Sequence, residues 1–214
     1  MNKLGRIFNS SIITWMLLAI VGIQALYWTA WMLSMIVHNQ APFWMLSIRG
    51  ICYGLLIPGG ILLAIWSKAK WETSAYYFGI VAGAVMTAAG AYDIYVHLNI
   101  VRAYWAATYK APTIMFFLVP GLLGLWPVFL SLVLVCRKKR GKLELILLIV
   151  AALLVLTTIA QLLSVFNVWV FSQIPGTLLS AVLLTILLWG FLYIIYQSLN
   201  SKRWLDKGKV NNIA

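Results

Sequence analysis

Acidic residues are scarce in this chain: only four of its 214 residues are Asp or Glu. All charged residues together make up 9% of the sequence, whereas soluble domains average about 25%. Hydrophobic residues make up 64%. So little charge cannot form the polar surface of a soluble domain. We therefore expect an all-α protein that is embedded in a membrane.

Cysteine and histidine are almost as rare, with two of each. Cys52 and Cys136 are expected at opposite membrane faces, too far apart for a disulfide, and no Cys-x-x-Cys, haem-attachment or iron–sulfur spacing is present. The sequence also lacks the Gly-x-Ser-x-Gly and His-Glu-x-x-His motifs and a glycine loop for phosphate. These absences argue against an enzyme without deciding the question, and they leave any catalytic residue unknown.

Long apolar runs are abundant, and each exceeds the roughly 20 residues that cross a bilayer core. We predict six transmembrane helices at residues 11–37, 44–66, 74–99, 112–135, 143–169 and 175–197. The first run is much longer than the 7–15 apolar residues of a signal peptide, so it is expected to remain as a span. Residues 1–200 are then one six-helix domain, and residues 201–214 form a short basic tail.

The net charge of +12 is distributed unevenly along the chain. Thirteen of the sixteen Lys and Arg residues fall on one side of the predicted bundle, leaving Arg49, Arg102 and Lys110 on the other. Because cytoplasmic segments carry the excess of Lys and Arg, both termini are predicted to be cytoplasmic. Attraction to anionic lipids explains the basic charge without nucleic acid. We expect a multi-pass protein of the plasma or inner membrane.

Small residues and prolines suggest how the helices pack. Gly79, Gly83 and Gly90 form a seam on the third span that lets another helix approach closely, so we expect this helix at the centre of the bundle. The segment Pro58-Gly-Gly60 is expected to interrupt the second span. The fifth and sixth spans are almost purely aliphatic and are expected to face lipid. Trp and Tyr near span ends, Trp66 among them, are typical of interfacial belts.

The most informative polar stretch is the outer end of the third span, where Asp93 and His97 share one helix face. At about 1.5 Å per residue, Asp93 lies roughly 28 Å, and Arg49 roughly 25 Å, above the cytoplasmic ends of their spans. Arg49 and Asp93 can therefore meet just below the outer interface. One interpretation is an ion pair that fixes helix register. The other is a site that binds a metal ion, relays a proton or binds a polar headgroup.

Three further groups, His38, Arg102 and Lys110, are expected near the same surface. Arg49, Asp93, Arg102 and Lys110 would form a charge cluster. Asp93 and His97 would be metal ligands, possible only with His38 or an outside group completing the site. The residues alone name no cofactor, and copper or zinc would suit this ligand set.

The pattern Asp93-x-x-x-His97-x-x-x-x-Arg102 resembles the metal-binding helix of the C subunit of particulate methane and ammonia monooxygenases. The resemblance covers about residues 93–112. In that family the Asp, the first His and a second His thirteen residues later bind copper. Here Lys110 stands at the second His position, and Ala103 replaces the acid that follows the arginine. The resemblance therefore implies a relative whose metal site is lost or altered, with an ammonium group where a metal cation would lie.

Three functions follow as hypotheses. The first is a non-catalytic or accessory subunit of a respiratory or monooxygenase-type membrane complex. The second is a copper-dependent or other metal-dependent membrane oxidase or monooxygenase subunit. The third is a transporter of small molecules or lipids. The expected partners are a bilayer with anionic lipids and either other membrane proteins or further copies of the chain, and nucleic acid is not expected.

Overall fold

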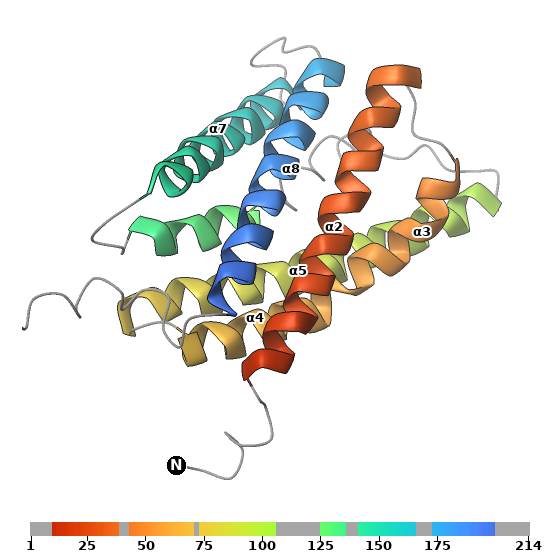
Figure 1. Ribbon diagram of the computed structural model, residues 1–214. Coiled ribbons are helices and arrows are strands. Elements are labelled where there is room, and N and C mark those ends of the chain that lie inside the picture. The colour runs from red at the N-terminus through yellow and green to blue at the C-terminus, as the bar shows by residue number, and fades with distance from the viewer. Residues whose placement is uncertain are drawn as a thin grey trace, which may run out of the picture.

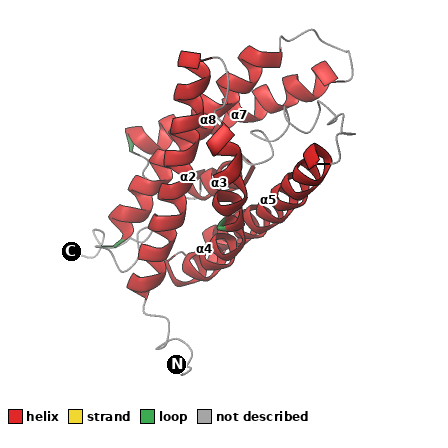
Figure 2. Ribbon diagram, turned by 90° about the vertical axis from the view of Figure 1, so that its right-hand side faces the viewer, coloured by secondary structure: helices red, strands yellow, loops and turns green. Residues whose placement is uncertain are grey.

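The described part of the chain is almost entirely helical. The structure is a computed structural model, and it describes residues 10–38, 43–70, 73–105, 125–135, 141–165 and 173–199. The labelled helices are α2 (Ser10–His38), α3 (Phe43–Gly54), α4 (Leu56–Lys70), α5 (Thr73–Trp105), α7 (Lys142–Val165) and α8 (Gln173–Ser198). A shorter apolar helix spans Leu125–Val135. No strand occurs within these ranges, as Figure 2 shows.

Five stretches of the described helices are long and apolar enough to cross a membrane. They are Ile12–His38, Ile48–Lys68, Ala75–Tyr95, Lys142–Ala160 and Leu178–Ser198. They correspond to five of the six predicted spans. The remaining one, at residues 112–135, lies partly outside the described residues, and only its end is seen as the helix Leu125–Val135.

The second span is broken, as the Pro58-Gly-Gly60 segment predicts. Helix α3 ends at Gly54 and α4 begins at Leu56. Pro58 has no N–H for the carbonyl of Gly54, four residues earlier, and its ring crowds that carbonyl. Two backbone bonds continue across the break, from Leu55 N to the carbonyl of Ile51 at 3.2 Å and from Gly59 N to the carbonyl of Leu55 at 3.0 Å. The span is therefore kinked but continuous.

Helices α4 and α5 pack more extensively than any other pair of labelled helices. Glycine allows the contact, because a Cβ on Gly60 would meet the backbone oxygen of Gly83, and a Cβ on Gly83 would meet that of Gly60. A Cβ on Gly90 would lie 2.8 Å from the carbonyl oxygen of Tyr53. The Thr87 hydroxyl lies in this seam and donates to Gly83 O at 3.0 Å and to Ile57 O, on α4, at 3.3 Å. The small residues thus replace side-chain packing by close backbone contact.

The expectation that the third span lies at the centre of the bundle is wrong for the labelled helices. Among them, α5 packs only against α3 and α4, whereas α2 packs against α3, α4 and α8 (Figure 1). From Gly83 to Gly90 the small-residue seam contacts one neighbour, the broken second span. A seam of small residues indicates that one helix approaches closely, but it does not indicate how many other helices surround the helix that carries it.

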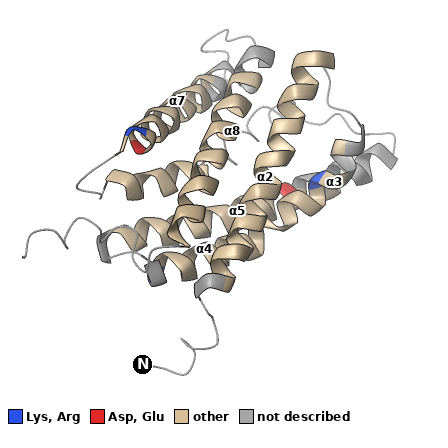
Figure 3. Ribbon diagram, viewed as in Figure 1, with Lys and Arg blue, Asp and Glu red and all other residues tan. Residues whose placement is uncertain are grey.

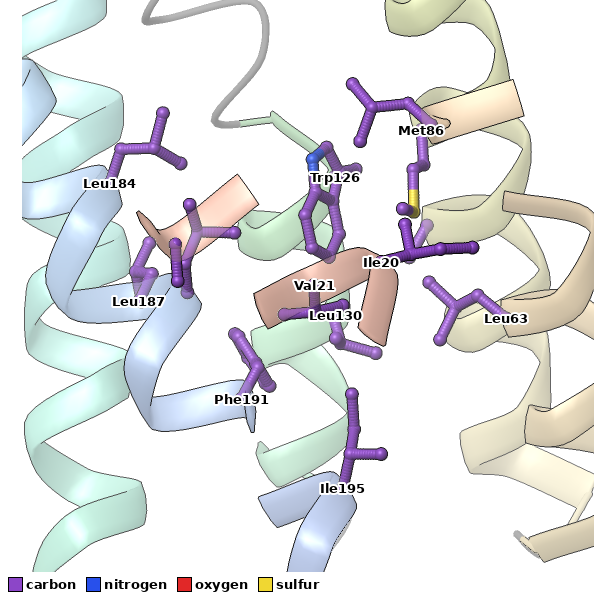
Figure 4. Close-up of a cluster of buried hydrophobic side chains, with 14 of the residues drawn as sticks. Ile20, Val21, Leu63, Met86, Trp126, Leu130, Leu184, Leu187, Phe191 and Ile195 are labelled. Atoms are coloured by element: carbon purple, nitrogen blue, oxygen red, sulfur yellow. The ribbon is translucent and has the colours of Figure 1, made fainter. Parts of the chain in front are cut away.

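The apolar core also corrects two further expectations. The sixth span, on α8, does not chiefly face lipid: it is 56% buried, against 33% for the fifth span on α7. Figure 4 shows α8 side chains such as Leu187 and Phe191 within the core. Trp66 faces the bundle instead of lipid, since it is 1% exposed and its indole N–H donates to Thr14 at 3.1 Å. Aliphatic composition alone does not distinguish a lipid-facing helix from one inside the bundle.

Candidate functional site

The candidate site is a buried ion pair between α3 and α5. Arg49 Nε donates to Asp93 Oδ2 at 3.1 Å, and Arg49 Nη2 donates to Asp93 Oδ1. Asp93 is 1% exposed and Arg49 is 8% exposed. In Figure 3 the described residues around this contact, apart from the one blue and the one red position, are tan and therefore uncharged. The helix arithmetic that placed both residues at one depth agrees with this geometry.

The aromatic residues beside the pair come from α2 and α3. Tyr53 follows Arg49 by one helical turn, and the guanidinium carbon lies 5.3 Å from the centre of its ring. The Tyr53 ring meets Tyr27 edge to face at 5.7 Å, and Tyr27 meets Trp28 edge to face at 6.0 Å. A cation over an aromatic face is attracted by about 0.5–2 kcal/mol, more when both groups are desolvated. The Tyr53 ring therefore adds to the stabilisation of Arg49 that Asp93 provides.

The pair neutralises itself. Two parallel N–H···O contacts to one carboxylate give an arginine its strongest and most directional interaction. Because each oxygen of Asp93 already accepts from Arg49, the charge of the carboxylate is balanced, and a metal ion would have only the lone pairs that the guanidinium leaves unused. The arrangement can hold two helices in register. It offers no free buried charge to act on a substrate.

The other predicted site residues are not brought to the pair in the described part of the chain. His38 is the exposed last residue of α2. It lies fourteen residues beyond Gln24, which contacts Cys52 beside the pair, and this is roughly 21 Å along the helix. Helix length thus carries His38 well beyond Asp93.

His97 and Arg102 lie on α5, but their side chains are outside the described features, and Lys110 lies outside the described residues altogether. Helix α5 continues to Trp105, beyond residue 99 where the predicted span ends. Among the described residues, no group of three His, Cys, Asp or Glu side chains is placed to hold a metal ion. The metal site at Asp93 and His97 and the full four-residue charge cluster stay predictions.

Sequence reasoning missed Gln24. This amide on α2 is 2% exposed, and its Nε2 donates to the carbonyl oxygen of Cys52 in the last turn of α3. The last four carbonyls of a helix lack partners within that helix, so a side chain from a neighbour is needed. The available signal was a single amide within the apolar run Ile12–His38.

These features define an all-helical bundle with five membrane-length helices and a buried, self-neutralised ion pair at the contact of two of them. Comparison of the chain with family models, curated proteins and solved structures gives no match. The interpretation of the site therefore depends on its geometry.

Proposed function

We propose that this protein is a six-span membrane protein with cytoplasmic termini and that it acts as a non-catalytic accessory subunit of a larger membrane complex. Five helices of membrane length and the excess of basic residues on one predicted side support the membrane topology. The resemblance of residues 93–112 to the monooxygenase C subunit favours a monooxygenase-type or respiratory complex. Partners would be membrane proteins or further copies of the chain in a bilayer with anionic lipid.

One observation supports a non-catalytic role above the others: both oxygens of Asp93 are bound by Arg49 in a buried, neutral pair. A buried ionisable residue in a membrane helix is a functional-site candidate by default, with its partner named. Here the partner is Arg49, which balances the charge of Asp93 and holds α3 against α5. The role of Asp93 is then positional, and the chemistry belongs to another subunit.

The topology has its own test, independent of any complex. Lys110→Cys and Lys139→Cys are each introduced after both native cysteines are changed to Ala, and intact cells are treated with a membrane-impermeant maleimide. We expect labelling at residue 110 only, because the proposal places it outside and residue 139 inside. Labelling at residue 139 in intact cells would show that the orientation is the opposite of the proposed one.

The accessory role is tested by purifying the tagged chain from its native membranes in a mild detergent. We expect a membrane-protein partner in fixed ratio with wild type and with the apolar double variant Arg49→Met/Asp93→Leu, because the pair only positions helices. A stable monomer without a partner would contradict the proposal. Loss of the partner in a double variant that is otherwise folded would show that the charges themselves are used in assembly.

Elemental analysis of untagged protein distinguishes the copper-dependent alternative from the accessory role. The ion pair leads us to expect copper and zinc well below one per chain, with no change on His97→Ala. If the wild type contains stoichiometric metal and His97→Ala loses it, the accessory proposal is wrong. The metal site implied by the sequence resemblance would then be supported.

A further inference from the structure

A small cavity lies one side chain away from the ion pair, behind the ring of Tyr53. It measures about 10 Å³, and its walls include Gln24 and Trp28 of α2, Tyr53 of α3, Trp126 of the helix Leu125–Val135, and Leu184 and Leu188 of α8. Four separate chain segments thus meet at this point. Figure 4 shows the Trp126 indole among the core side chains of neighbouring helices.

The walls of the cavity carry polar groups whose bonding is incomplete. Gln24 and Trp126 are each 2% exposed, and Trp28 is 4% exposed. Gln24 Nε2 donates to Cys52 O, yet within the described part of the chain its Oε1 accepts no hydrogen bond. The indole N–H groups of Trp28 and Trp126 likewise have no protein acceptor among the described residues. A buried polar group without a hydrogen-bond partner is costly. One acceptor and two donors at a single cavity can all be satisfied by one small molecule that both donates and accepts hydrogen bonds.

We propose that this cavity is a binding site for a single water molecule held by Gln24, Trp28 and Trp126. The volume fits, since about 10–15 Å³ of this kind of space accommodates one water. The water donates to Gln24 Oε1 and accepts from the two indole N–H groups, which gives the three hydrogen bonds usual for a buried water. A lipid headgroup or a quinone ring is far too large for the same space.

The bound water has a structural consequence. Gln24 already fixes the end of α3 through Cys52 O, and the water ties the same amide to the helix Leu125–Val135. Water is one of the groups that satisfy polar atoms near proline kinks in membrane helices. The end of α3 is then connected to α2 and to the helix Leu125–Val135 through one amide and one water.

Radiolytic hydroxyl labelling of the purified full chain tests the proposal, because a bound water generates oxidant beside buried side chains. We expect oxidation of Trp126 above that of Trp66, which is 1% exposed and lies off the cavity. Oxidation of Trp126 no greater than that of Trp66 would overturn the site.

A cavity-filling variant gives the second measurement. Leu188→Phe extends a wall residue into the space, so we expect loss of the Trp126 label. Ile186→Phe, on the exposed face of the same helix, should retain it. Persistence of the label in a folded Leu188→Phe protein would contradict the proposal, and if that variant does not fold, the wild-type contrast between Trp126 and Trp66 decides alone.

Discussion

Removing one partner of the buried ion pair should destabilise the protein far more than removing both. Arg49→Met leaves Asp93 charged and 1% exposed without a counterion, and such a change typically costs about 3–5 kcal/mol. The contact between the guanidinium and the Tyr53 ring is lost as well, at about 0.5–2 kcal/mol. Total stabilities of about 5–15 kcal/mol are usual, so this single change removes a large share.

The double variant Arg49→Met/Asp93→Leu should recover most of that loss. Replacing a buried pair by apolar side chains of similar volume is often neutral or stabilising by about 1–4 kcal/mol. Arg49→Lys should fall between the two, because an ammonium group keeps the charge but cannot make the two parallel contacts. The expected order of stability is therefore double variant, then Arg49→Lys, then Arg49→Met.

Unfolding in mixed micelles of a mild detergent and dodecyl sulfate, followed by tryptophan fluorescence, measures these differences. Lys68→Met is the matched control, since Lys68 is an exposed cation on α4 and its loss should stay within about 0.5 kcal/mol. If Arg49→Met is as stable as Lys68→Met, or if the single effects simply add in the double variant, the pair does not hold α3 to α5.

Two other substitutions test the seam between α4 and α5. Gly60→Ala should cost about 1–3 kcal/mol, because its methyl group would meet backbone atoms, whereas Gly22→Ala should be nearly neutral with only a side-chain carbon 3.7 Å away; thermal unfolding of both variants checks this. Thr87→Val should cost about 0.6–1.7 kcal/mol through its lost bond to α4, and Thr185→Val, whose hydroxyl bonds only within α8, should cost less in the same assay. Equal effects of the two glycine substitutions would argue against close packing at Gly60, and equal effects of the two threonine substitutions would argue against a stabilising bond from Thr87 to α4.

Much of the architecture could be predicted because the bilayer limits the possible structures. Apolar runs of sufficient length predict helices, and five of the predicted spans appear as such. The break in the second span follows from Pro58, and the meeting of Arg49 with Asp93 follows from helix rise and a short loop. Each of these inferences uses distances along one or two neighbouring helices.

The remaining features depend on which faces meet, and composition carries little of that information. The burial of α8 and the peripheral place of α5 are set by contacts between helices far apart in the sequence. Gln24 was missed because it is a single amide in an apolar run, and no second polar residue at helical spacing indicates its role. Its acceptor, Cys52 O, is a backbone carbonyl that needs a partner from outside its helix only because the second span is broken.

Four of the polar contacts between helices described above share one element, the broken second span. Arg49 is bound by α5, Cys52 O by Gln24 of α2, Ile57 O by Thr87 of α5, and the indole of Trp66 by Thr14 of α2.

The contacts lie on both sides of the break at Leu55, two on α3 and two on α4. A kink that moved during function would need one half free to turn, because packed helices change by discrete shifts of whole elements. Side chains of α2 and α5 hold both halves. The second span is therefore bound by its neighbours on both sides of the break, which supports the proposed accessory role over that of a transporter that must open and close.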